Sequence, residues 1–352
     1  MTVNIMQEVH CSGTPREIGR QHGSSATDKI KGTLAFYTEY FQRKANMDWK
    51  SASVTAEKFL PLLERDWPEL VEEMRGVAEG AGLPFSTILA MNVRTEISMG
   101  MMTDGCTALA WKTDDISLLA QNWDWEVPQQ SNLIALHIQQ DGKPSISQIT
   151  EAGIIGKIGI NSAGVGTCLN AIRAKGVDYN RLPAHLALRV ALNSRSRAQA
   201  VARLEKAGLA AAAHILIGDA TGATSLEFSA LDLVRFEMKD GRIAHTNHFL
   251  VKHVDGVADA TFMPDSKERM VRITQLLTKS AELGESPTVA KFDEMLQDEK
   301  GLPGAINRVA SPASPSATLF SIVMDLGAKV ASVKFGRPSL SQSVLLLEPS
   351  KM

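Results

Sequence analysis

The spacing of the apolar residues changes abruptly at Cys106, and this change constrains the fold more than any other feature. Before it, apolar side chains recur about every 3.6 residues, as from Leu60 to Val77, which is typical of amphipathic helices. After it come short β-like runs separated by turn signals, such as the hairpin-favouring pair Asp141-Gly142. The sequence therefore predicts a helical N-terminal part followed by a part rich in strands.

The N-terminal part, residues 1–100, is predicted to be helical. Thr14 begins the first helix, because Glu17 three residues later completes the sequence pattern of a capping box. Pro61 and Pro68 fall within the second helical run and indicate kinks or separate segments, since proline removes a backbone donor.

The part after Cys106 is predicted to contain many strands with helices inserted in pairs. The expected strands span residues 107–111, 116–121, 133–139, 145–150, 155–160, 165–170, 214–218, 224–228, 233–238, 242–246, 318–324, 329–335 and 344–347. The expected helices span residues 183–192, 197–206, 267–280 and 289–296. Strands and helices rarely alternate one by one, so the pattern favours an α+β sandwich over a doubly wound parallel sheet.

The composition is that of an ordinary globular protein. The 352 residues carry a formal net charge of -2, with 44% hydrophobic and 22% charged residues. This balance gives no support for a nucleic-acid or membrane-surface partner. No run of 18 apolar residues suggests a membrane span, and Met1–Glu8 lacks the basic and apolar regions of a secretory signal.

The three cysteines, Cys11, Cys106 and Cys168, are too few and odd in number for a disulfide framework. A reducing intracellular compartment is therefore expected. CxxC, HExxH and EF-hand patterns do not occur, so neither a metal site nor a bound cofactor is expected.

The C-terminal tripeptide Ser350-Lys351-Met352 differs at one position from the peroxisomal address Ser-Lys-Leu. Methionine keeps an apolar side chain of similar size at that position. A peroxisomal location is therefore one hypothesis, and a frayed tail on a cytoplasmic protein is the alternative.

Cys106 itself follows Asp104-Gly105. Glycine permits backbone conformations that other residues avoid, so the Gly-Cys peptide can be held under strain. A thiol beside such a peptide can attack the preceding carbonyl and form a thioester, which water then opens to free a new amine on Cys106. The alternative is a small buried hydrophobic residue at the start of a strand.

Further motifs occur in one order along nearly the whole chain. They are Gly13-Thr14-Pro15-Arg16-Glu17-Ile18-Gly19, His22-Gly23, Asn92-Val93-Arg94-Thr95-Glu96, Asp104-Gly105-Cys106-Thr107, Gln121-Asn122-Trp123-Asp124, Ile149-Thr150-Glu151-Ala152-Gly153-Ile154-Ile155-Gly156-Lys157, Leu226-Glu227-Phe228-Ser229, His245-Thr246-Asn247-His248, Ala317-Thr318-Leu319-Phe320 and Gly336-Arg337-Pro338. Together they resemble the acyl-coenzyme A:6-aminopenicillanic acid acyltransferases, which belong to the N-terminal-nucleophile (Ntn) hydrolases.

The resemblance implies a four-layer αββα sandwich of two antiparallel sheets between helical layers. It also implies self-cleavage between Gly105 and Cys106. The small fragment would be residues 1–105 and the large fragment residues 106–352, and the two would fold together as one domain.

The resemblance also assigns roles to Cys106 and Asp124. Cys106 is the expected nucleophile, and its freed α-amino group would take the thiol proton, since the reference pKa of an α-amine is about 7.7–8.0. Asp124 is expected to hold the resulting ammonium or to orient the thiol. An exposed carboxylate in a turn is the alternative for Asp124.

Three further polar residues complete the expected site. Asn247 is expected to donate to the oxyanion of the tetrahedral intermediate. Asn170 is a candidate for a second polar group there, with a strand-end cap as the alternative. Ser229 matches a serine that the family needs for processing or acyl transfer, and its alternative is a strand-end hydroxyl that bonds to the backbone.

One position departs from the family pattern. The penicillin-forming enzymes carry Ser-Arg-Gly before Ala-Thr-Leu-Phe, whereas this chain has Ser314-Pro315-Ser316. Pro315 cannot supply the guanidinium that helps to hold the nucleophile in related amidases. Arg308, seven residues upstream, is a candidate substitute.

The expected activity is transfer of an acyl group from acyl-CoA, or from an amide, through a Cys106 thioester to an amine. The expected partners are thus a small acyl donor and an amine acceptor, with acyl-CoA as a co-substrate and no other cofactor. Two alternatives remain at this stage. The first is an amidohydrolase that releases the acyl group to water, and the second is an uncleaved, inactive relative that serves as a binding protein.

Overall fold

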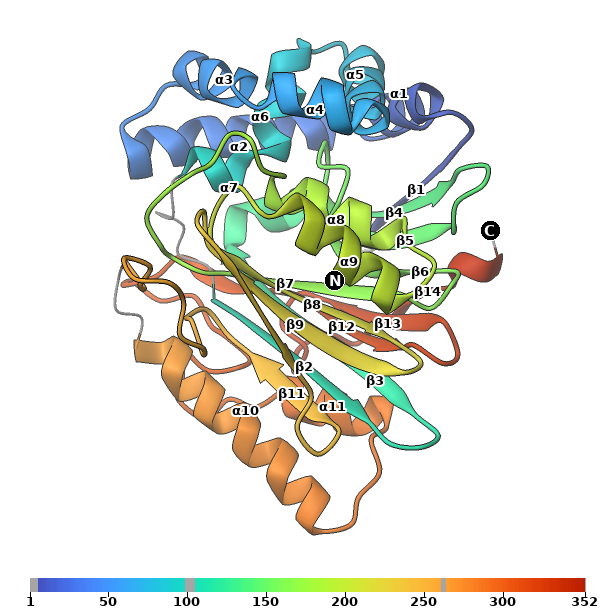
Figure 1. Cartoon of the computed structure of the whole chain (residues 1–352), viewed down its shortest axis with the longest axis vertical. Helices are drawn as coiled ribbons and strands as arrows, with labels where there is room; N and C mark the ends of the chain where they lie inside the picture. Colours follow the sequence, from blue (N-terminus) through green and yellow to red (C-terminus); the bar gives the residue numbers. More distant parts are fainter. Residues whose placement is uncertain (1–5, 99–104, 261–263, 352) are drawn as a thin grey trace.

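The structure is a computed structural model that describes residues 6–98, 105–260 and 264–351 (Figure 1). The helices are α1 (Pro15–Ser25), α2 (Thr27–Ala45), α3 (Trp49–Glu57), α4 (Leu60–Asp66), α5 (Pro68–Ala81), α6 (Phe85–Asn92), α7 (Arg94–Ile97), α8 (Ala184–Leu192), α9 (Arg197–Ala207), α10 (Pro264–Glu282) and α11 (Val289–Leu296), with short 3-10 helices η1 (Val127–Asn132) and η2 (Pro349–Lys351).

The strands form two sheets, which we call sheet 1 and sheet 2. Sheet 1 has eight strands in the order β1 (Gln7–Ser12), β4 (Leu133–Gln139), β5 (Ile146–Glu151), β6 (Ile158–Asn161), β7 (Gly166–Ala171), β8 (Ala213–Asp219), β9 (Gly222–Phe228) and β10 (Leu233–Glu237). Sheet 2 has six in the order β11 (Arg242–His245), β2 (Gly105–Lys112), β3 (Ser117–Glu126), β12 (Ser316–Asp325), β13 (Val330–Phe335) and β14 (Leu345–Leu347).

The two sheets face each other, and helices cover their outer sides. Figure 1 shows α1 to α9 on the side of sheet 1, whereas α10 and α11 lie on the side of sheet 2. The side-chain amide of Gln121 in β3 donates to the carbonyl oxygen of Leu169 in β7 at 2.5 Å, which ties the sheets together. This arrangement confirms the α+β class and the four αββα layers. No described helix has the length and apolar character that crossing a bilayer requires.

The expectation that residues 1–100 are helical is wrong at one place. Gln7–Ser12 forms the edge strand β1, which pairs in parallel with β4, from Gln7 opposite Ile134 to Ser12 opposite Gln139. Sheet 1 is therefore antiparallel except for this pair. A short edge strand whose partner lies far along the chain leaves no hairpin signal in the sequence.

The local helix signals, in contrast, are confirmed. The side chain of Thr14 accepts from the backbone N–H of Glu17, whose own carboxylate accepts from the Thr14 amide at 2.8 Å, as a capping box requires. The second helical run is divided into α3, α4 and α5, and Pro61 and Pro68 lie in the first turns of α4 and α5.

The helices α1 and α5 approach each other closely because glycines lie at their contact. A Cβ on Gly19 would lie 2.0 Å from the carbonyl oxygen of Glu73, and a Cβ on Gly80 would lie 2.2 Å from that of Arg20. Any larger residue at these positions would separate the two backbones.

The hydrophobic core continues from the N-terminal helices into the strands that follow Cys106. A buried charge cluster joins the same two parts. Glu151 in β5 lies 2.9 Å from Arg94 Nη2 and 2.5 Å from Lys157 Nζ, and it accepts a hydrogen bond from Tyr37. Burial acts to raise the pKa of Glu151, but Arg94 and Lys157 outweigh it and hold the pKa well below its usual range.

His22 in α1 makes the stability of this junction depend on pH. Its Nε2 accepts from the Gly153 amide at 3.1 Å. Burial, with a smaller contribution from Arg189, lowers its pKa from 6.5 to about 4. The unfolded chain therefore binds a proton between these pH values that the folded chain does not, so the free energy of unfolding falls as the pH drops through this range.

We expect wild type to lose about 3 kcal/mol from this group between pH 6.5 and pH 4. His22→Gln keeps an acceptor for the Gly153 amide and has no proton to gain. The variant's free energy of unfolding should therefore fall by about 3 kcal/mol less than that of wild type over this pH range. Denaturant unfolding of both proteins across this pH range checks the prediction. Equal losses in the two proteins would contradict it.

Candidate active site

Cys106 lies at the second residue of β2, and its side chain is buried. It is paired with Trp123 in β3, and cross-strand partners in an antiparallel pair share one face of the sheet. The thiol lies on the face that meets sheet 1, because it is near Cys168 in β7. Burial and the nearby Cys106 thiol raise the pKa of Cys168 well above its usual value. Gly105 and its partner Asp124 belong to the opposite face.

The backbone of Cys106 is held by two side chains. Its N–H donates to Asn247 Oδ1 at 2.7 Å, and its carbonyl oxygen accepts from Arg269 Nη1 at 2.6 Å. Arg269 Nη2 also donates to Asn247 Oδ1, at 3.0 Å. A guanidinium only donates, so the oxygen of the Asn247 amide must face Arg269 and Cys106. The amide nitrogen of Asn247 donates to the Ala171 carbonyl at 3.0 Å.

Two carboxylates and two arginines lie on the helical side of this strand. Arg308 Nε lies 3.4 Å from Asp124 Oδ2, and Thr318 Oγ1 donates to Asp124 Oδ1 at 2.7 Å. Asp265 in α10 contacts Arg308 and lies 3.3 Å from Arg269 Nη2. Burial raises the pKa of Asp124 to about 7, although Arg308 and Arg269 act to lower it.

The Arg308 guanidinium also packs directly on Gly105. A Cβ at this position would lie 2.5 Å from Arg308 Nε, so this packing requires glycine before Cys106. Pro315 is exposed, and its carbonyl accepts from the Val127 amide at 3.1 Å. The structure places Arg308 beside Asp124 and Gly105, and its role as a substitute for the family arginine remains a prediction.

The other two candidate residues take part in none of the hydrogen bonds of the Cys106 backbone described above. Asn170 Oδ1 lies 2.9 Å from His214 Nδ1, and Asn170 Nδ2 donates to the carbonyl oxygen of His245 at 3.5 Å. Ser229 Oγ donates to Asp232 Oδ1 at 2.5 Å and accepts from the Leu231 amide at 3.1 Å, as in a turn. The structure brings Gly105, Cys106, Asp124 and Asn247 together, whereas the roles of Asn170 and Ser229 remain predictions.

Three residues that contact this site were not foreseen from the sequence: Arg269, Asp265 and Thr318. Asp265 and Arg269 are four residues apart on α10, a spacing that is usually an exposed ion pair on a helix. Thr318 lies in the matched motif Ala317-Thr318-Leu319-Phe320, which was the available signal, whereas its pairing with Asp124 is visible only in the structure.

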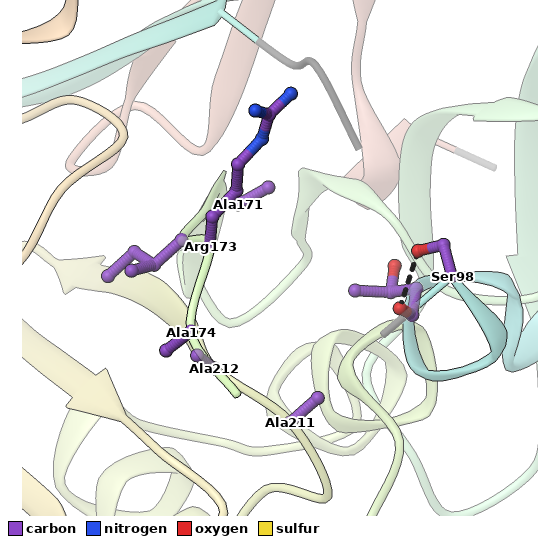
Figure 2. A pocket seen from close by; sticks show the side chains of 8 residues that line it. Ser98, Ala171, Arg173, Ala174, Ala211 and Ala212 are labelled. Carbon is purple, nitrogen blue, oxygen red and sulfur yellow. Dashed lines mark hydrogen bonds between the residues drawn. The ribbon is translucent and has the colours of Figure 1, made fainter. Parts of the chain in front are cut away.

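A small hollow with a cavity volume of about 10 Å³ lies next to Asn247, because Ala171, whose carbonyl accepts from this asparagine, belongs to its wall (Figure 2). It is lined by Thr95, Ser98, Ala171, Ile172, Arg173, Ala174, Ala211 and Ala212. Four of these eight residues are alanines, and Thr95, Ser98 and Arg173 supply polar groups to the wall.

Among the residues that the structure describes, Glu8, His10 and His137 form the one group with possible metal-ligand atoms within 4.8 Å of one another. The two imidazole rings are stacked 4.4 Å apart at an angle of 9°. A metal bound to an imidazole lies in the plane of the ring, and parallel planes share no such point. We therefore assign no metal to this group.

Two facing sheets between helical layers, with Cys106 at the start of a strand, form the αββα sandwich that the resemblance implies. The profile of the family described as acyl-coenzyme A:6-aminopenicillanic acid acyl-transferase matches residues 111–340. The protein described as acyl-coenzyme A:6-aminopenicillanic-acid-acyltransferase 40 kDa form, from Emericella nidulans, is 39% identical over 340 residues, which cover 95% of this chain and 94% of that protein. The chain therefore belongs to this acyltransferase family, as the sequence motifs predicted.

A solved structure, penicillin V acylase from Agrobacterium tumefaciens, is similar at a TM-score of 0.41 and 14% identity, over 70% of this chain and 87% of that one. The profile match begins after Cys106 and includes Asp124 and Asn247, whereas the longer alignment covers almost the whole chain.

Proposed function

We propose that the chain is a self-processing acyltransferase. It cleaves the bond between Gly105 and Cys106, and then moves an acyl group from acyl-CoA, or from an amide, through a Cys106 thioester to an amine. The main support is the hydrogen bond from the Cys106 backbone nitrogen to Asn247 Oδ1, in an amide whose orientation Arg269 sets. This nitrogen is the leaving group of the proposed cleavage.

The cleavage begins when the Cys106 sulfur attacks the carbonyl carbon of Gly105. The bond to the Cys106 nitrogen then breaks, and the thiol proton passes to that nitrogen. Water hydrolyses the resulting thioester, which leaves a carboxylate on Gly105 and a free thiol and amine on Cys106. Asn247 Oδ1 already accepts from this nitrogen, so it stabilises the positive charge that develops there.

In the cleaved protein, the Cys106 amine accepts the thiol proton while the sulfur attacks the thioester carbonyl of acyl-CoA. Coenzyme A leaves as a thiol and takes that proton. An amine acceptor then attacks the acyl-enzyme, the amide product departs, and the Cys106 thiol is restored. No cofactor besides this co-substrate is proposed.

Residues 1–105 and 106–352 would remain associated as a heterodimer after cleavage. The support is the shared hydrophobic core, the pairing of β1 with β4, and the buried Arg94–Glu151 ion pair. A peroxisomal location, with the cytoplasm as the alternative, is proposed from Ser350-Lys351-Met352. Met352 and the motif residue Asp104 lie outside the described residues.

Release of coenzyme A tests the transferase activity. Purified protein is given phenylacetyl-CoA or a long-chain acyl-CoA, with and without 6-aminopenicillanic acid. We expect faster release with the amine present and an amide product. Release that is indifferent to the amine would instead support the hydrolase, and no release together with no cleavage would support an inactive relative.

A further inference from the structure

Glu227 in β9 has a fully buried carboxylate that binds one segment of chain at four points. Oε1 accepts from the Leu250 amide and from His245 Nε2, both at 2.7 Å. Oε2 accepts from the Val251 amide at 3.3 Å and lies 3.2 Å from His253 Nε2. All four partners belong to the segment 245–253, which follows β11.

The carboxylate is ionised in the folded protein. Burial acts to raise the pKa of Glu227, but His245, with support from Leu250 and His253, outweighs it and lowers the pKa. His245 Nδ1 faces the Thr246 carbonyl oxygen at 2.8 Å, and a carbonyl only accepts. The ring therefore donates from Nδ1. Charge-assisted hydrogen bonds of this kind are stronger than neutral ones.

The segment has no regular secondary structure beyond His245, so side chains supply many of its hydrogen bonds. Ser266 Oγ accepts from the Asn247 amide at 2.8 Å, and Glu227 holds the residues on either side. Buried backbone N–H groups need partners, and here no strand ladder supplies them. Glu227 accepts from Leu250 and Val251 after Asn247, and it contacts His245 before it. Glu227 thus contacts the chain on both sides of Asn247, in addition to the hydrogen bonds that Ser266 makes with residues 246–248.

The hydrogen bonds extend from Glu227 to Ser229. His253 Nδ1 lies 2.7 Å from Asp232 Oδ1, and the same oxygen accepts from Ser229 Oγ at 2.5 Å. Asp232 Oδ2 accepts from the Val254 amide at 2.9 Å. Ser229 is therefore linked to the Asn247 segment through Asp232 and His253, although its own hydrogen bonds do not reach Cys106.

We propose that Glu227 is a positioning residue that holds Asn247 Oδ1 against the nitrogen of Cys106, and that Ser229 acts through it. The effect on cleavage rests on the proposed self-processing, whereas the anchoring of segment 245–253 does not. A displacement of about 1 Å in a positioned group can cost about 100-fold in rate. Loss of Glu227 should therefore slow cleavage without removing any group that touches the scissile bond.

The test compares Glu227→Gln with Glu73→Gln. Glutamine at 227 has a single acceptor oxygen, and its NH₂ group must face an N–H donor of the segment. Glu73 is equally buried and pairs with Arg189 at 2.6 Å, away from segment 245–253, so it serves as the matched control. Cleavage is followed by intact mass, and hydrogen exchange is measured for peptides that contain Leu250 and Val251.

We expect Glu227→Gln to cleave about 10–100-fold more slowly than wild type and to exchange faster at these amides. Glu73→Gln should match wild type in both. If wild type cleaves, and Glu227→Gln cleaves and exchanges as wild type does, the positioning role is overturned while the proposed function stands. Equal slowing in Glu73→Gln would also overturn it, because general destabilisation would then explain the effect.

The same experiment also covers two other results: no cleavage of wild type, and failure of Glu227→Gln to fold. If wild type does not cleave, the proposed function fails, and unchanged exchange in Glu227→Gln would separately overturn the anchoring. If Glu227→Gln does not fold, Ser229→Ala tests the same chain of contacts from its far end. Slower cleavage and faster exchange are expected for Ser229→Ala, and wild-type values for both would overturn the proposal.

Discussion

Asn247→Leu is expected to slow cleavage of the precursor by about 10²–10³-fold, whereas Asn247→Asp should retain much of the rate. The reason is that Asn247 acts through its oxygen, which accepts from the Cys106 nitrogen at 2.7 Å. Aspartate keeps an oxygen at this place and leucine does not. Time courses of intact mass for freshly purified precursors measure both rates.

The comparison distinguishes two roles for the same side chain. The family resemblance predicts a donor to the oxyanion, a role that aspartate cannot fill. Equal loss in Asn247→Asp and Asn247→Leu would therefore contradict the acceptor role. Asn161→Leu is the matched control, because this buried asparagine at the end of β6 donates to the Leu192 and Ser194 carbonyls, both at 2.7 Å. The folded Asn161→Leu precursor should cleave at the wild-type rate.

Arg308→Gln is expected to shift the pH dependence of cleavage and to slow it about tenfold or more at pH 7. The ionised Asp124 holds the Arg308 guanidinium over Gly105. The pKa of Asp124 is about 7, so cleavage should slow as the pH drops below that value and Asp124 becomes protonated. Arg308 acts to lower this pKa, so its removal raises it and moves the acid limb to higher pH.

Cleavage rates between pH 5 and pH 9 give the midpoint of the acid limb for wild type and for Arg308→Gln. Asp124→Asn should remove this limb altogether, and Arg272→Gln, which loses a partly exposed pair with Asp298, should leave the profile unchanged. The same midpoint in wild type and Arg308→Gln would contradict the coupling of Arg308 to Asp124.

The sequence predicted those parts of the fold that local signals determine. The change at Cys106, the cap at Thr14 and the divisions at Pro61 and Pro68 all depend on residues close together in the chain. The strand β1 was missed because its only strong signal is its pairing with β4, which no local pattern reveals.

The site was predicted less completely, for a related reason. Motifs identified Asp124 but not the face from which it extends, because strand register decides that Gly105 and not Cys106 is its partner. Arg269 was missed because a helical pattern does not show which polar residue is buried. Its contacts with the Cys106 carbonyl and Asn247 join segments far apart in the chain.

The account depends most directly on cleavage before Cys106, and intact mass spectra test it. Wild type, Cys106→Ala and Cys168→Ala are purified under denaturing conditions and weighed. Wild type and Cys168→Ala should each give two fragments, residues 1–105 and 106–352, because Cys168 is a buried neighbour outside the proposed reaction. Cys106→Ala should give one intact chain. A single undivided mass for wild type would contradict the account.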